Sequence, residues 1–522
     1  MLTIFLAPIA LTLLQYAPVP RRIISRFNAS LIYPAVWGKR HSQPMPLNLG
    51  IAPTRGQAFF IAFIIAINVI FAGVGITVGH PNAFYQDDIS GGVKGLVANR
   101  LGVLAFANLV LVFLFAGRNN ILLWITDWSH STFLLLHRWI AYVAIAMALL
   151  HSVLYLDQYV ESGMHATESV KPYWYWGIIA TLSFTLILPL SVLPVRQRVY
   201  EFFLTFHIAF AALAVIGCYL HIWFMFEHMW GYETWLYPVM AHWAFDRLVR
   251  VLRVVRNGLR WAEASIIDED YTMITVPGVA VDGYAYLYFP TLTWRFWENH
   301  PFSVASVLLP VGGHEDLKDE NSLSTGSRSS TSANEKLPIS STTSGEIHDP
   351  EQNAGRNIAQ TKSAVGLTFF IRNQSGLTSL LQSHRTLRVL VESPYGRHKS
   401  LSSFPSLICI AGGVGITSVL PALRQHVGYT KLYWGVRSDG IVKAMTPYLG
   451  NVDKVVSIGK RLAIAELLHG EIGADESGGD VAVMVSGPPR MADDVRDVVS
   501  RLGRAAGGKK RRIEFIEESF TW

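Results

Sequence analysis

Long apolar blocks fill the first half of the chain and constrain its fold more than any other feature. A membrane-spanning helix needs about 20 predominantly apolar residues. Seven segments are candidate spans: residues 1–17, 57–79, 99–117, 131–155, 173–195, 200–224 and 234–255. The first is the weakest, because it is short and contains Pro8. The sequence therefore predicts an α-helical transmembrane bundle of about seven helices over residues 1–256.

Basic residues gather at the ends of these blocks rather than on one soluble face. One cluster lies between the first two blocks and another closes the last one: Arg21, Arg22, Arg26, Lys39, Arg40 and Arg55, then Arg247, Arg250, Arg253, Arg256 and Arg260. Loops rich in Lys and Arg stay in the cytosol. We therefore expect the N-terminus outside and the second half of the chain in the cytosol. The net charge of +6 then reflects membrane topology, and we expect no nucleic-acid partner.

The second half of the chain has the pattern of a soluble α/β protein. Short strand-like segments such as "EASIID" and "YTMITVP" begin near residue 258, and after Ser403 buried strands alternate with helices. Residues 313–363 are polar, rich in Ser and Thr and almost free of large apolar side chains. Such a segment cannot bury enough surface to fold, so we expect a disordered insertion.

Four histidines share one spacing inside the apolar blocks. His137 and His151 are 14 residues apart, and His207 and His221 repeat that spacing two spans later. Fourteen helical residues come within about 40° of four full turns and rise about 21 Å, so each pair lies on one helix face. The two helices run in the same direction. His137 should therefore lie level with His207, and His151 with His221.

Histidine pairs at two depths suit axial ligation of two haem irons, which would carry electrons across the membrane. Histidines satisfied within the core or at the membrane interface are the first alternative. A proton relay is the second, but it would not need equal spacing. The matched depths favour haem.

Glycine-rich turns in the second half indicate a dinucleotide site. "IAGGVGITSVL" at 410–420 follows an apolar strand and opens a helix, where phosphates approach the backbone. "LYWGVR" at 432–437 ends in an arginine that can meet a 2′-phosphate, which favours NADPH. "SGPPRMADDV" at 486–495 forms a third turn at the end of a strand.

Longer motifs extend this pattern over nearly the whole chain: "PTRGQA", "NRLGVLAFANL", "FLFAGRNN", "DWSHSTFLLLHRW", "YEFFLTFHI", "HPFSVAS", "AGGVGIT", "SGPPRMADDV" and "EESFTW". They resemble the fungal ferric-chelate reductase family, which belongs with the NADPH oxidases. The resemblance implies a ferredoxin-reductase-like module after the bundle. Residues 257–402 would form an antiparallel β-barrel that binds FAD, and residues 403–522 a doubly wound α/β domain that binds NADPH. The family's axial haem ligands fall on His137, His151, His207 and His221.

The resemblance also implies the cofactor contacts. FAD would contact His300, Pro301, Phe302, Ser303, Val304, Ala305, Ser306, Arg372, Gly376 and Thr378. NADPH would contact Gly412, Gly413, Gly415, Ile416, Thr417, Arg437, Ser486, Gly487 and Pro488. An aromatic residue near the flavin would be Phe520 or Trp522. The family's Cys-Gly-Pro turn begins with Ser486 here, so we expect a lower rate of hydride transfer, which Ser486→Cys should raise.

Further residues have two interpretations each. Arg138, beside an inner ligand, would pair with a haem propionate or reach the interface as a snorkelling arginine. Outer-loop residues could meet a metal or lie solvated: His80, Asp87, Asp88 and His165.

The resemblance implies a plasma-membrane enzyme that passes electrons from NADPH through FAD and two b-type haems to extracellular ferric chelates, for metal uptake. Cupric ions are a candidate second substrate, and iron-uptake proteins or a homo-oligomer are candidate partners. A superoxide-generating NADPH oxidase would share every motif and differ in the acceptor. A non-catalytic haem-binding sensor or transporter is the rival of another class, and the nucleotide motifs argue against it.

Overall fold

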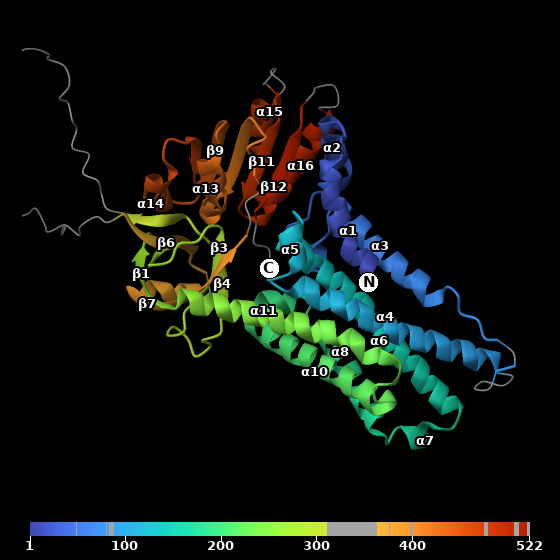
Figure 1. The fold of residues 1–522 in the computed structure, drawn as a ribbon. Coiled ribbons are helices and arrows are strands. Elements are labelled where there is room, and N and C mark those ends of the chain that lie inside the picture. The colour runs from blue at the N-terminus through green and yellow to red at the C-terminus, as the bar shows by residue number, and fades with distance from the viewer. Residues whose placement is uncertain are drawn as a thin grey trace, which may run out of the picture.

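The computed structural model describes residues 1–48, 50–79, 81–82, 88–310, 363–374, 376–396, 400–473, 479–505 and 511–518. The expected insertion lies outside the described residues except for Ser363, which begins a strand. Phe520, Trp522, His80 and Asp87 also lie outside them. Figure 1 shows long helices side by side in one part of the molecule and two sheets in the other.

Five helices form the apolar bundle. Among the described residues, they are the helices long and apolar enough to cross a membrane: α3 (Arg55–Gly73), α4 (Ile89–Ala116), α6 (His130–Glu161), α8 (Pro172–Leu190) and α10 (Tyr200–Phe226). Helix α4 packs along α6, and α8 packs along α10. Each histidine-bearing helix therefore has one neighbour along its length.

The two remaining expected spans differ from this group. Helix α1 (Leu2–Leu13) has 12 residues, too few to cross the hydrocarbon on its own. Helix α11 (Leu236–Asn257) has 22 residues, but its arginines make it amphipathic rather than uniformly apolar. Five of the described helices are thus long and uniformly apolar, and the count of about seven spans stays a prediction.

Local sequence signals set several helix starts. Thr54 and Gln57 cap each other at α3, where Thr54 Oγ1 accepts from the Gln57 backbone and Gln57 accepts from the Thr54 backbone. Ser129 caps α6 in the same position. Short helices lie between the long ones: α2 (Arg21–Phe27), η2 (Asn28–Ile32), α5 (Ile121–Ile125), α7 (His165–Glu168), α9 (Leu193–Arg198) and η4 (Met229–Trp235).

A curled antiparallel sheet of seven strands follows the bundle, in the order β4-β3-β7-β1-β2-β6-β5. Alternating apolar residues fill its interior, including Ile274, Val276, Phe369 and Val389. Its elements are β1 (Leu259–Ile266), β2 (Tyr271–Pro277), β3 (Tyr284–Tyr288), β4 (Asn299–Ser303), β5 (Ser306–Pro310), β6 (Ser363–Arg372), α12 (Leu377–Leu380) and β7 (Thr386–Tyr395).

A parallel sheet of five strands completes the structure, in the order β10-β9-β8-β11-β12. Its elements are β8 (Ser406–Gly412), α13 (Ile416–Gln425), β9 (Tyr429–Val436), α14 (Gly440–Leu449), β10 (Asp453–Ile458), α15 (Ile464–Gly473), β11 (Val481–Ser486), α16 (Pro489–Ala505) and β12 (Ile513–Glu517). Strand β8 lies between β9 and β11, so the turns after these three strands meet at one edge. The predicted fold class, a helical bundle followed by an antiparallel and a doubly wound domain, is confirmed.

Candidate functional site

The four histidines lie in two facing pairs. The ring centres of His137 and His207 are 6.2 Å apart at an angle of 68°. Those of His151 and His221 are 6.4 Å apart at 90°. A metal ion bonded to one nitrogen of each ring at about 2 Å would hold the ring centres about 6 Å apart. Both pairs therefore fit one ion between them, and the pairs are those that the 14-residue spacing predicts.

Hydrogen bonds fix which nitrogen is free in three of the four rings. Nδ1 donates to a backbone carbonyl in three of the four rings: His137 to Val112 at 2.9 Å, His151 to Ala98 at 2.8 Å, and His221 to Tyr173 at 2.9 Å. A carbonyl oxygen only accepts, so Nδ1 carries the proton and Nε2 keeps its lone pair. Such bonds orient histidines that bind a metal. The residues therefore fit haem iron, although their role as its ligands stays a prediction.

His207 has a different partner. Its Nδ1 lies 3.3 Å from the hydroxyl of Ser191, which is the C-cap residue of α8. A hydroxyl can donate or accept, so this contact alone does not select one tautomer.

Two glycines leave room for the second pair. A Cβ on Gly102 of α4 would lie 2.9 Å from Nδ1 of His151, and one on Gly177 of α8 would lie 2.9 Å from Nδ1 of His221. Any other residue at either position would displace an imidazole. Neither glycine stands out in the sequence, although small residues in membrane helices commonly mark close packing.

Two arginines lie near the first pair. Arg138 and Arg196 are both within electrostatic range of His137, and Arg196 also acts on His207. Arg138 Nε donates to the Leu134 carbonyl at 3.3 Å. In the part of the chain that the structure describes, no carboxylate acts on either guanidinium. A haem propionate would supply the missing negative charge, which suits the predicted role of Arg138.

The segment predicted to contact FAD lies where the two sheets meet. Residues 299–303 form β4, an edge strand beside β3. The Ser303 hydroxyl lies 2.8 Å from that of Ser418 in α13, and Arg424 of α13 donates to the Ala305 carbonyl at 2.9 Å. Ala305 is buried in the core cluster that includes α13, and Val304 in the interior of the antiparallel sheet. The structure thus brings the predicted flavin strand against α13, the helix that follows the predicted nucleotide turn.

Arginines from both sheets converge on Tyr271. Arg372 ends β6 and Arg437 follows β9, and both act electrostatically on Tyr271. Burial raises the pKa of this tyrosine, and the two arginines oppose that effect. A Cβ on Gly413 would lie 3.1 Å from the Tyr271 hydroxyl. Two predicted anion contacts therefore lie beside the glycine turn.

The two turns after β8 and β11 touch each other. A Cβ on Gly412 would lie 2.5 Å from Cδ of Pro488, and one on Gly415 would lie 2.3 Å from the Ser486 carbonyl oxygen. Gly413 has a φ of +54°, which glycine adopts without strain. The turn continues into the buried first residues of α13, Ile416 and Thr417, and packs against Gly487. These residues share the carboxyl edge of the sheet, where α/β domains bind ligands.

Four predicted residues have mainly local contacts. Gly376 has a φ of +100° and precedes α12, and the Thr378 hydroxyl bonds the Gln374 backbone at 3.0 Å. Asp88 caps α4 by accepting from Gly91 at 2.9 Å. His165 packs against Trp174, with ring centres 5.5 Å apart. Among the described residues, the group suited to a metal ion lies elsewhere, at Glu201, Glu298 and His300.

Sequence analysis missed a buried carboxylate that joins the antiparallel sheet to the bundle. Glu392 of β7 is fully buried, and Arg118 Nη1 and Arg250 Nε donate to its Oε1 at 3.2 and 3.0 Å. The hydroxyls of Tyr288 and Tyr395 also donate to it. Burial alone would raise the pKa of Glu392, but the two arginines hold it below its usual range. We call this cluster the Glu392 joint.

A second carboxylate joins the parallel sheet to the segment between α1 and α3. Asp493 of α16 is buried and accepts from the backbone N–H groups of His41, Ser42 and Gln43 at 3.0, 2.7 and 3.1 Å. The Ser42 hydroxyl donates to Glu517 at 2.7 Å. We call this cluster the Asp493 joint.

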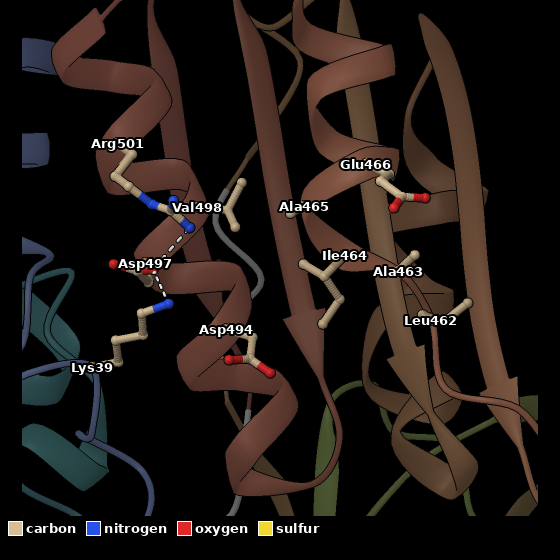
Figure 2. Close-up of a pocket in the computed structure, with 10 residues that line it drawn as sticks. All are labelled: Lys39, Leu462, Ala463, Ile464, Ala465, Glu466, Asp494, Asp497, Val498 and Arg501. Carbon is tan, nitrogen blue, oxygen red and sulfur yellow. Dashed lines mark ion pairs between the residues drawn. The ribbon is translucent and has the colours of Figure 1, made fainter.

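Neighbouring contacts widen the Asp493 joint. Figure 2 shows Asp497 between Lys39 and Arg501, each paired with it at 3.0 Å. Tyr33 lies in the core formed by α16 and β12, with its ring 5.6 Å from that of Phe515. The chain segment before α3 is therefore part of the core of the parallel-sheet domain, which we call the nucleotide-side domain.

Comparisons with known proteins agree with this arrangement. Residues 101–218 match the family model of the ferric reductase like transmembrane component, and residues 257–399 match that of an FAD-binding domain. The chain is 27% identical over 433 residues to the ferric/cupric reductase transmembrane component 1 of Candida albicans, covering 80% of this chain and 50% of that protein. It is 26% identical over 539 residues to the ferric reductase transmembrane component 3 of Saccharomyces cerevisiae, covering 96% and 72%.

The chain thus spans about half the length of the Candida relative. A solved structure with some likeness is the ferredoxin reductase in carbazole 1,9a-dioxygenase in its FAD apo form. It shows 14% identity over 50% of this chain and 66% of that one, with a TM-score of 0.28. The two family matches and the relatives aligned along most of its length make the chain similar to the fungal ferric reductases, with a transmembrane ferric-reductase region followed by an FAD-binding domain.

Proposed function

We propose that this protein is a plasma-membrane metalloreductase. Electrons from cytosolic NADPH would cross the membrane by way of FAD and two b-type haems to extracellular ferric chelates, with cupric ions as a second candidate acceptor. The observation that carries the proposal is the two histidine pairs, spaced for one metal ion each and with Nε2 free in the rings whose Nδ1 is bonded to a carbonyl. Haem supplies reversible one-electron transfer at its iron.

The Asp493 joint supports the proposed orientation. It holds residues 41–43 against the nucleotide-side domain, so both lie on one side of the membrane. Helices α3, α4, α6, α8 and α10 are an odd number of crossings and end on the opposite side. The chain must return before β1 begins at Leu259, so we assign α11 as the returning span. The predicted seventh crossing and the external N-terminus would further require residues 1–17 to cross the membrane, although α1 is shorter than a usual span.

In this orientation the first histidine pair is the inner one. His137 follows the α4–α6 connection, where Arg118 contacts the antiparallel sheet, so His137 and His207 would hold the haem nearer the cytosol. His151 and His221 would hold the outer haem. Arg138 and Arg196 would bind propionates of the inner group.

The soluble residues would hold the electron donors. FAD would contact β4 and the segment after it, together with Arg372, Gly376 and Thr378. NADPH would contact the touching turns after β8 and β11, with Arg437 at its 2′-phosphate. The contact between Ser303 and Ser418 supports this division, because it places the two predicted cofactor segments side by side.

The first test uses membranes that contain the chain, NADPH and ferric citrate, with ferrous iron followed by a colorimetric chelator. We expect iron reduction that superoxide dismutase does not inhibit and that His151→Ala abolishes. Inhibition by the dismutase would make oxygen the acceptor and support the oxidase. Bound haem without NADPH oxidation would support the sensor or transporter.

Haem content tests the ligands separately from activity. The unaltered chain should bind two haems, and His137→Ala or His151→Ala should each lower the haem absorbance by about half, since each ion needs both axial histidines. His165→Ala, which alters a half-buried histidine of α7 outside the two pairs, is the matched control. Full haem content in both variants would contradict the assignment.

A further inference from the structure

The loop between β3 and β4 exposes three aromatic side chains close together. Trp294 is 78% exposed, Phe296 62% and Trp297 41%. The Trp297 ring meets Trp294 edge-on at 5.4 Å and Phe296 at 5.0 Å. We call these residues the 294–297 patch. Single exposed apolar residues are common on proteins, but a contiguous aromatic patch indicates a contact surface.

The patch lies beside the first turn of a membrane span. Glu298 and His300, which follow the patch, have ligand atoms within 4.8 Å of that of Glu201. Glu201 lies in the first turn of α10, and Arg295 of the patch acts on it electrostatically. The patch is therefore at the level where α10 emerges from the bundle.

Polar contacts hold the base of this loop in place. Arg295 Nε donates to Glu298 at 2.9 Å, and Asn299 donates to the Trp297 carbonyl at 3.1 Å. Asn299 also accepts from Arg118 of the Glu392 joint at 2.8 Å. The aromatic rings are thus presented outward from a fixed support.

We propose that the 294–297 patch inserts into the headgroup region of the cytosolic leaflet, with the lipids of the surrounding membrane as its partner. Tryptophan is enriched at membrane–water interfaces, where its ring meets both apolar chains and polar groups. Continuity with α10 favours lipid over a protein partner, and three side chains are far fewer than a stable protein interface needs. The antiparallel sheet is then attached to the membrane by an aromatic anchor as well as by the Glu392 joint.

Spin labelling of the full-length chain in phosphatidylcholine–phosphatidylserine nanodiscs tests the proposal. Cys218 and Cys409 are buried, so Phe296→Cys offers an accessible thiol for a nitroxide. Oxygen concentrates in bilayers and a nickel chelate stays in water. We expect oxygen to increase the relaxation rate of the label at position 296 more strongly than the nickel chelate does. Val427→Cys, at a position 95% exposed in the parallel-sheet domain, is the matched control and should show the reverse.

A label at position 296 that reports the same water exposure as position 427 would overturn the proposal. So would a label shielded from both reagents, because that would indicate a protein contact. Trp294→Cys provides a second position if the first variant does not fold. The measurement needs no electron transfer, so its failure is distinguishable from failure of the proposed reductase activity.

Discussion

The Glu392 and Asp493 joints use the same chemical group in opposite ways. Each attaches a soluble domain to the membrane part through a buried carboxylate. Glu392 is neutralised by the guanidinium groups of Arg118 and Arg250, and it accepts hydrogen bonds from two tyrosine hydroxyls. Asp493 is held by the backbone N–H groups of residues 41–43 and by the Gln43 amide.

The difference determines what is left behind when either charge is removed. Without the Glu392 charge, two buried cations lose their counter-ion, and an uncompensated buried charge is costly. Without the Asp493 charge, only neutral N–H groups are affected, and they lose the charge of their acceptor. Removal of the carboxylate charge should therefore destabilise the Glu392 joint more than the Asp493 joint, although both carboxylates are equally buried.

Glu392→Gln should have the largest effect. We expect the free energy of unfolding of the soluble half to fall by about 3–5 kcal/mol, because Arg118 and Arg250 remain buried without a counter-charge. Denaturant titration in detergent would measure it. Glu263→Gln, on an exposed position of β1, is the control and should change little. Equal effects of the two variants would contradict the asymmetry between the joints.

Asp493→Asn should cost less, about 1–3 kcal/mol, because the amide keeps one oxygen acceptor for the three N–H groups. Hydrogen exchange at residues 41–43 measures the loss directly, as these N–H groups are the ones released. Asp494→Asn on the same helix is the matched control. If Asp493→Asn proved as damaging as Glu392→Gln, counter-charge would not be the deciding difference.

The Asp493 joint should also weaken in mild acid. Burial first, and then the charge of Arg496, lower the pKa of His41 to about 4. When residues 41–43 are detached from Asp493, His41 titrates near its ordinary pKa of about 6.5. Between pH 7 and 5 the detached form therefore binds a proton, whereas the form bound to Asp493 stays unprotonated. The joint should lose about 2 kcal/mol over that interval.

Hydrogen exchange at residues 41–43 across pH, corrected for intrinsic rates, would show this weakening, and His41→Gln should remove it. The Glu392 joint should stay unchanged in the same interval, because the pKa of Glu392 lies below its usual range and its charge is lost only in stronger acid. A wild-type response that persists in His41→Gln would assign it to another group.

Ser42→Ala should have the smallest effect, about 1 kcal/mol, because it removes one hydrogen bond to Glu517 and leaves the backbone contacts intact. A double-mutant cycle with Glu517→Gln isolates that bond. Additive effects of the two substitutions would mean that the bond contributes nothing to docking.

The features that sequence predicted well depend on local geometry. The 14-residue spacing determines which helix face and which depth each histidine occupies, so the pairs could be found without knowing how the helices pack. Glycine turns after apolar strands likewise predict the edge where Gly415 and Ser486 meet.

The two joints could not be predicted in this way. Asp493 lies in an acidic, polar stretch that is typical of an exposed helix start, and its partners are about 450 residues earlier. Arg250 counts in the sequence as a topology signal, whereas in the structure it is a partner of Glu392. Such contacts depend on the relative placement of whole domains, which no short pattern encodes.

The position of Tyr33 has a consequence for biogenesis. Its hydroxyl accepts from the Phe515 backbone across 482 residues of sequence, with the entire bundle synthesised in between. During translation this segment must wait beside the membrane until β12 leaves the ribosome, and contacts between such distant residues form slowly. Until then the apolar side chains of this segment lack the surface of α16 and β12 that covers them. The soluble half produced without residues 25–43 would keep that surface open and should tend to aggregate.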